Sequence, residues 1–229
     1  MLTLHTADLL VTGPGSVPVP GGAVLVEGDR IAGVGPYEAL AERYPHARTR
    51  RWPGVLTPGL VVRGAELLLE RTYYPDDPYE IAELGADPVT GAEALDALGL
   101  TEARWGNSAR RATQKLLSRG VVAVGGRLRV PSVRTAVSRS GLALIPAVPV
   151  LPGDGRASGA PDAGDSVPPS LDPFAGRDAV AGAFHGALER GGPARFAAFD
   201  APDLDALLAR GATTCVATVI GGRLLHRRR

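Results

Sequence analysis

The sequence predicts an α/β protein with a smaller all-β part, and three observations carry this prediction. Short apolar runs separated by Gly and Pro open the chain, a pattern typical of β-hairpins. Strand-like and helix-like segments then alternate between residues 60 and 150, which indicates a mainly parallel sheet with right-handed crossovers. A β-branched run at 213–220 ends in Gly221-Gly222, which predicts a second hairpin near the C-terminus.

The first part of the chain predicts short strands and one helix. The expected strands lie at 9–11, 23–27, 30–34 and 48–52, and the expected helix at 37–44. Gly28-Asp29 separates two of the strands and favours a tight turn, because Gly adopts positive φ and Asp bonds its own backbone. Pro36 suits the first turn of the helix and Pro45 ends it.

Residues 51–67 organise the chain, because they join its two kinds of pattern. Pro53 and Pro58 each bias the residue before them towards extended geometry. The segment therefore predicts a rigid bend that leads into a new apolar strand at Leu60. Residues 65–70 fit either a continuation of that strand or a helix, and residues 71–80 favour an exposed loop.

The elements beyond this bend alternate in type. Strands are expected at 60–62, 121–124 and 142–150, and helices at 90–98, 109–118 and 131–138. Ser108 is the expected cap of the second helix, while Gly120 and Gly141 end the second and third helices. Residues 151–173 are rich in Pro, Gly, Ala, Asp and Ser, which predicts a flexible loop. The last expected elements are helices at 177–190 and 204–209, a strand at 195–199 and the hairpin of 213–220 with 223–226.

Two stretches resemble the start of an amidohydrolase-superfamily protein of the imidazolonepropionase or aminodeoxyfutalosine-deaminase type. They are residues 22–35 and the step Pro58-Gly59-Leu60-Val61. The resemblance implies a small composite β-sandwich built from both termini, residues 1–59 and 194–229, with a β/α barrel inserted between them. It also implies a metal-binding His-x-His a few residues after the step. Those two positions hold Gly64 and Glu66 in this chain.

The inserted region, residues 60–193, is too short for a complete barrel, which needs roughly 200–250 residues. Three or four strands are the most that it can supply, so we expect a truncated barrel with open sheet edges. Open edges invite pairing with other strands. We therefore expect the helices, the Pro/Gly loop or another subunit to cover them, and predict a homodimer or a protein partner.

Charge and cysteine content limit the function classes. The net charge of +1 predicts no attraction to nucleic acid or to an anionic membrane. Arg227-Arg228-Arg229 favours a solvated tail over a phosphate-binding patch. The single cysteine, Cys215, lies in an apolar run and is expected to be a buried thiol. Without an apolar leader or a long apolar run, the chain is expected to be cytoplasmic.

The histidines do not predict a metal centre. The four are His5, His46, His185 and His226. His185 and Glu189 would share one face of the expected helix, either as two ligands or as an ordinary surface pair. Neither a Cys pair nor HExxH is present, so we expect no metal and no cofactor. Gly125-Gly126-Arg127 fits either a backbone anion site or a simple turn.

The densest group of functional side chains follows the strand at Leu60. Arg63, Glu66 and Glu70 are the candidate catalytic residues, because paired carboxylates can divide acid and base roles. Their polar neighbours in sequence are Arg71, Tyr73, Tyr74, Asp76 and Asp77. The alternative is a solvated surface with ion pairs.

Two functions follow from these observations. The first is a degenerate amidohydrolase-like protein, a pseudoenzyme that binds a small metabolite or a protein partner without metal-dependent catalysis. The alternative is a hydrolase that uses carboxylates on carbon–nitrogen bonds of a cyclic amide, an amidine or an aminopurine-like substrate.

Overall fold

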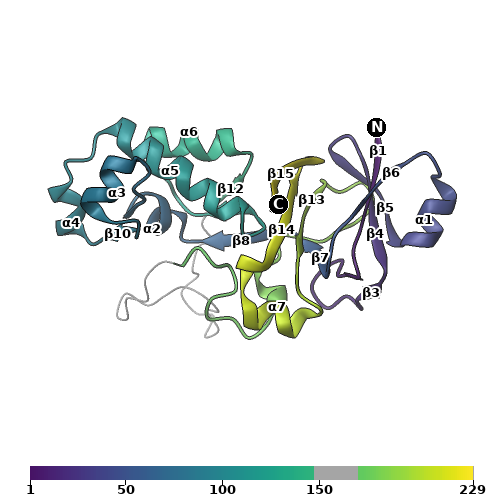
Figure 1. Ribbon diagram of the computed structural model, residues 1–229. Helices are drawn as coiled ribbons and strands as arrows, with labels where there is room; N and C mark the ends of the chain where they lie inside the picture. Colours follow the sequence, from purple (N-terminus) through teal and green to yellow (C-terminus); the bar gives the residue numbers. More distant parts are fainter. Residues whose placement is uncertain (147–169, 229) are drawn as a thin grey trace, which may run out of the picture.

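The protein is a mixed α/β structure with several sheets. The computed structural model describes residues 1–146 and 170–228 and holds seven α-helices there (Figure 1). The N-terminal strands lie at one end of the molecule and most of the helices at the other (Figure 1). Strands from the C-terminus lie between these two parts. None of the helices in the described ranges is long and apolar enough to cross a bilayer.

The first sheet contains four strands in the order β5-β4-β1-β6. Its strands are β1 (Leu2–Thr6), β4 (Gly22–Glu27), β5 (Arg30–Pro36) and β6 (Arg48–Arg51). The predicted hairpin is confirmed, because Glu27 pairs with Arg30 across Gly28, whose φ is +60°. The predicted helix is also confirmed as α1 (Tyr37–Arg43), with Pro36 at its N-cap position.

The second sheet unites the two ends of the sequence. Its order is β15-β14-β13-β7-β2-β3. The strands are β2 (Leu9–Leu10), β3 (Val19–Pro20), β7 (Val55–Pro58), β13 (Arg195–Phe199), β14 (Cys215–Ile220) and β15 (Arg223–Arg227). The antiparallel pair β7–β13 joins them, with Phe196 opposite Pro58 and Phe199 opposite Val55. The predicted hairpin at Gly221-Gly222 is confirmed as β14–β15.

The central strands of this second sheet, β7, β13 and β14, are buried on both faces. Successive side chains of a strand point to opposite faces. Phe196 and Ala198 of β13 pack in a core that includes Val24 and Val26 of the first sheet. Ala197 and Phe199 pack instead in the largest core, with the strands and helices of the inserted region. The six-stranded sheet is therefore the central layer that connects the two ends of the molecule.

The inserted region contains a parallel sheet in the order β12-β11-β8. Its strands are β8 (Leu60–Arg63), β11 (Val121–Gly125) and β12 (Ala143–Ile145), and α5 (Glu102–Leu117) and α6 (Pro131–Ser140) cover it (Figure 1). This confirms the predicted parallel strand–helix alternation. Gly141 ends α6 in the left-handed region with φ +84°, as its position after the helix predicts.

The predicted loop at 71–80 is wrong. The segment forms β9 (Thr72–Tyr73), which pairs with β10 (Val89–Thr90), and leads into α3 (Pro78–Leu84). Asp77 caps α3 by accepting a hydrogen bond from the Tyr79 N–H at 2.7 Å. Tyr73 and Tyr74 are buried: the Tyr73 ring lies edge-on to Trp105, and Tyr74 belongs to the largest core. The short helices α2 (Ala65–Leu69) and α4 (Ala92–Ala97) complete this side.

The predicted cap at Ser108 is also wrong. Helix α5 begins two turns earlier, where the Thr101 hydroxyl accepts from the Arg104 N–H. Ser108 lies inside the helix, and its hydroxyl accepts from the Tyr74 N–H at 2.9 Å. Trp105 packs against the core one turn after the helix begins. Gly106 and Ser108 are weak helix formers, so this part of the helix depends on tertiary packing.

The predicted helix at 177–190 is a third correction. The structure has only the 3-10 turn η1 (Val180–Ala183), after which Phe184 forms an isolated bridge with Leu60. Gly182 and Gly186 weaken helical propensity, and Gly186 adopts φ +78°. The buried Phe184 therefore covers the free edge of β8. The remaining elements, α7 (Leu204–Arg210) and η2 (Ala212–Thr214), precede β14.

Two predictions fall wholly or partly outside the described residues. The strand expected at 142–150 is described as β12 up to Ile145, and its last residues lie outside. The loop expected at 151–173 is described only from residue 170 onwards.

Candidate functional site

The candidate catalytic residues lie where β8 ends and α2 begins. Arg63 is the last residue of β8 and is exposed, whereas Glu66 and Glu70 are half-buried on α2. Gly64 permits the sharp turn between the two elements, because it adopts φ +72°. The structure therefore brings the three side chains to one end of the parallel sheet.

The Glu66 carboxylate holds the turn after β11. Its Oε2 accepts a hydrogen bond from the Arg127 N–H at 3.3 Å. A Cβ on Gly126 would collide with this carboxylate, so the glycine permits the close approach. The Gly126 N–H donates to the Ile145 carbonyl. The segment 125–127 is therefore a turn with internal partners, which contradicts its interpretation as an anion site.

Glu70 makes a stronger contact of the same kind. Its Oε1 accepts hydrogen bonds from the N–H groups of Arg129 and Val130, both at 2.7 Å. These two groups precede α6, whose N-cap position is Val130 and has no side-chain cap. A negative group near the start of a helix is also favoured by the helix dipole. Both carboxylates thus connect α2 to the segment that leads into α6.

We expect Glu70→Ala to lower the free energy of unfolding by about 1–2 kcal/mol, because two backbone donors lose a charged acceptor. Urea denaturation measures this loss. Glu83→Ala, which changes an exposed residue of α3, is the matched control and should change stability by less than about 0.5 kcal/mol. Equal losses in the two variants would contradict the anchoring role.

The other polar candidates have separate partners. The Tyr73 hydroxyl lies 2.7 Å from Glu80, which also pairs with Arg104 at 3.0 Å. Asp76 forms an ion pair with Arg111. Glu80 and Asp76 are therefore paired with arginines of α5.

Tyr74 lines a different cavity, of about 380 Å³, together with Arg119 and Asp172. Burial raises the pKa of its hydroxyl to about 12, although nearby Arg119 opposes the shift. The phenol therefore stays protonated at neutral pH. Arg71 is exposed, and its side chain forms no ion pair with the described residues.

His185 lies in an extended segment, so the predicted helical pair with Glu189 is wrong. Its backbone N–H donates to the Gly59 carbonyl at 2.8 Å. Burial lowers the pKa of its imidazole, and the positive charges of Arg195 and Arg63 lower it further. The imidazole is therefore mainly neutral at pH 7. The backbone at His185 runs along the edge of β8 that β11 leaves open.

The residues present do not fit the metal centre that the family resemblance implies. Gly64 has no donor side chain, and Glu66 already accepts from the backbone at Arg127. In the described ranges, His, Cys, Asp and Glu side chains form no group of three or more that could hold a metal ion. Catalytic zinc sites normally use three such ligands. The end of β8 thus offers an incomplete ligand set.

The family comparison matches two strands of the first sheet and the helix that follows them. Residues 22–47 match the family model described as imidazolonepropionase-like composite domain, bacteria. This segment is thus similar to the imidazolonepropionase-like composite domain of bacteria. The match spans β4, β5 and α1, and it confirms the resemblance expected from residues 22–35. A comparison with curated proteins gives no significant match.

Several solved structures are similar to part of this chain. A. niger ochratoxinase is 22% identical with a TM-score of 0.44, over 63% of this chain and 31% of that one. Helicobacter pylori aminofutalosine deaminase is 16% identical with a TM-score of 0.42, over 64% and 33%. E. coli guanine deaminase is 14% identical with a TM-score of 0.45, over 64% and 36%. The chain thus spans about a third of each structure, and matches at this level assign it no activity.

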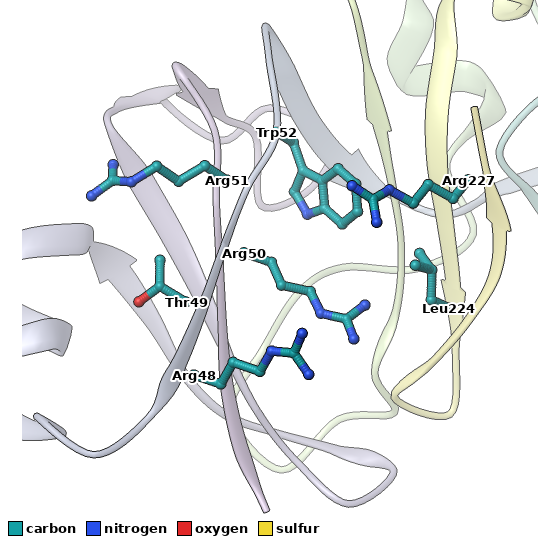
Figure 2. Close-up of a pocket in the computed structure, with 7 residues that line it drawn as sticks. All are labelled: Arg48, Thr49, Arg50, Arg51, Trp52, Leu224 and Arg227. Carbon is teal, nitrogen blue, oxygen red and sulfur yellow. The ribbon is translucent and has the colours of Figure 1, made fainter. Parts of the chain in front are cut away.

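One charged cavity was not predicted, and it corrects part of the expected solvated tail at 227–229, because Arg227 belongs to β15 and lines the cavity. It brings Arg48 and Arg50 of β6 together with Arg227 of β15 (Figure 2). The spacing of Arg48 and Arg50, two residues apart in a strand, could have indicated that both side chains lie on one face. The contribution of Arg227 depends on how two distant strands meet, which the sequence does not show.

Proposed function

We propose that this chain is a degenerate amidohydrolase-like protein that binds a small metabolite or a protein partner instead of catalysing metal-dependent hydrolysis. One observation carries the proposal. Glu66 and Glu70, the carboxylates at the end of β8, accept hydrogen bonds from backbone groups of the segment 127–130. These carboxylates therefore have a structural role at the position where the family resemblance implies a reaction centre.

The proposal includes an architecture. A composite β-sandwich of residues 1–59 and 194–229 would support a truncated β/α region of residues 60–193. The β7–β13 pair and the core shared by the first two sheets support this division. A homodimer or a protein partner would cover the remaining edge of the parallel sheet at β12, where Leu144 is 44% exposed. The measured solution mass would test the dimer.

The metal content of the purified chain tests the proposed function. After incubation with excess zinc and dialysis, we expect less than stoichiometric metal in the wild type and the same value in Glu66→Ala. Stoichiometric zinc that Glu66→Ala abolishes would overturn the proposal. Zinc retained equally by the variant would also overturn it and would locate the site away from Glu66.

The alternative is hydrolysis of a carbon–nitrogen bond by the carboxylates. It requires Glu66 or Glu70 to act as a base. Each carboxylate uses only one of its two oxygens in the backbone contacts, Oε2 in Glu66 and Oε1 in Glu70. Turnover of cyclic amides, amidines or aminopurines by the wild type, lost in Glu66→Gln and Glu70→Gln, would establish this alternative. Absence of turnover together with saturable metabolite binding would support the binding role.

A further inference from the structure

Three arginines converge on a cavity between two edge strands. Strand β6 ends the first sheet and β15 ends the second. Arg48 and Arg50 extend from β6 towards Leu224, and Arg227 extends from β15 towards Trp52 (Figure 2). The cavity has a volume of about 280 Å³. This volume approaches the lower limit of typical small-ligand sites, roughly 300 Å³.

The register of the first sheet explains why these side chains share one face. Arg50 lies opposite His5 in the parallel pair β1–β6, and Arg48 lies two residues before it. Side chains two residues apart point to the same face of a strand. Arg51 points to the opposite face, where its guanidinium lies 4.6 Å from the Tyr37 ring centre. The convergence of Arg48 and Arg50 thus follows from strand geometry.

Among the residues that the structure describes, no acidic side chain lines the cavity. Its residues are Arg48, Thr49, Arg50, Arg51, Trp52, Leu224 and Arg227. Within residues 1–146 and 170–228, the arginines in ion pairs are Arg30, Arg104, Arg111 and Arg228. Arg48, Arg50 and Arg227 are thus not paired with a described carboxylate. Guanidinium groups stay charged at every physiological pH, so their mutual repulsion favours the binding of an anion between them.

From this convergence of Arg48, Arg50 and Arg227 on one cavity, we propose a binding site for a small oxyanion that carries two or more negative charges. Phosphate groups and paired carboxylates share the oxygen geometry that a guanidinium fork binds in bidentate fashion. Trp52 and Leu224 supply an apolar wall next to the charged groups. The site lies on β6 and β15, so it does not depend on the function proposed for Glu66.

Arginines on edge strands also have a purely structural role, because charge there discourages pairing with other strands. That role requires no ligand and no cooperation between Arg50 and Arg227. The two roles therefore differ in one measurable property, which is saturable binding of a small anion at constant ionic strength.

Calorimetric titration of the full chain with pyrophosphate and, separately, with citrate tests the site. Sodium chloride should hold the ionic strength at about 0.15 M, because salt screens non-specific attraction. We expect saturable binding that Arg50→Gln weakens by about tenfold or more, since each charge-assisted fork contributes on this scale. Binding of pyrophosphate alone would indicate a phosphate ligand, and tighter binding of citrate a polycarboxylate.

Two variants control this experiment. Arg134→Gln removes the same charge from an exposed position on α6 and should bind like the wild type. Arg227→Gln changes an exposed residue of the last strand, so it tests the site even where Arg50→Gln fails to fold. Absence of saturable binding in the wild type would overturn the proposal. Equal weakening in Arg134→Gln, or binding of an oligonucleotide but neither small anion, would overturn it as well.

Discussion

Gly54→Ala is expected to lower the free energy of unfolding by about 3 kcal/mol. Gly54 adopts φ +68°, which costs an L-residue roughly 1–2 kcal/mol. A Cβ at this position would also collide with the backbone carbonyls of Phe199 and Ala201. Backbone cannot move aside as a side-chain end can, and such overpacking costs about 1–3 kcal/mol. The turn therefore tolerates only glycine.

The position of Gly54 explains why this loss would affect the whole molecule. Its N–H donates to the Asp8 carboxylate at 2.7 Å, and its carbonyl accepts from the Leu9 N–H at 3.0 Å. It immediately precedes β7, the strand that pairs with β13 from the C-terminal segment. A shift at Gly54 would therefore disturb the central sheet at the point where the two ends of the chain meet.

Gly15→Ala is the matched control for this prediction. Gly15 has nearly the same backbone angle, φ +70°, but an added Cβ would meet no atom within 4 Å. We expect Gly15→Ala to lower the free energy of unfolding by about 1 kcal/mol, from the cost of positive φ alone. Urea denaturation of both variants separates this cost from the cost of the Cβ collision at Gly54. Similar losses at Gly54 and Gly15 would show that the collision is relieved by local movement.

Local signals in the sequence predicted much of this architecture. Gly28-Asp29 fixes a tight turn by its own chemistry, and the β4–β5 hairpin follows. Helices α1 and α6 are also local, because Pro36 and Gly141 determine where a helix can begin or end. Burial of Cys215 followed from its apolar neighbours, and that burial raises the pKa of the thiol to about 11. In each example the determining groups lie within a few residues of one another.

The errors arose where tertiary contacts override local preference. Ser108 has the chemistry of a cap, yet the distant Tyr74 N–H engages its hydroxyl inside α5. Phe184 leaves helical geometry because it covers the edge of β8. For the candidate site, the sequence left residues 65–70 open between a strand and a helix, and the structure forms α2 with Glu66 inside it and Glu70 at its C-cap. Their partners come from 59 to 61 residues away, so no local pattern reveals their structural use.

The stability of the wild type should fall by about 3 kcal/mol as the pH decreases from about 6.5 to about 4, through His5 alone. His5 lies in β1 and is only 2% exposed. Its Nδ1 accepts a hydrogen bond from the Trp52 indole N–H at 3.2 Å, which requires an unprotonated nitrogen. Burial lowers the pKa of the imidazole from 6.5 to about 4, and the positive charge of Arg50 contributes further.

The sign follows from proton uptake in the two states. Below pH 6.5 the unfolded chain binds a proton at His5, whereas the folded chain resists protonation until pH 4. The contribution of His5 to the free energy of unfolding is therefore fully present above pH 6.5. It decreases as the pH falls from 6.5 to 4 and changes no further below pH 4. Each pKa unit corresponds to about 1.4 kcal/mol, so a shift of this size gives roughly 3 kcal/mol.

Urea midpoints measured from pH 7.5 to 4 in the wild type and in His5→Gln isolate this contribution. The amide oxygen of glutamine can still accept from Trp52, but the side chain binds no proton. The difference in stability between the two proteins should shrink by about 3 kcal/mol across the range. His185 and His226 also have lowered pKa values, but their contributions are common to both proteins and cancel in the difference.

A difference in stability that stays constant with pH would contradict the prediction, because it would show that His5 has the same pKa in the folded and unfolded chain. Arg50→Gln should flatten the curve only slightly, because burial is the larger cause of the shift.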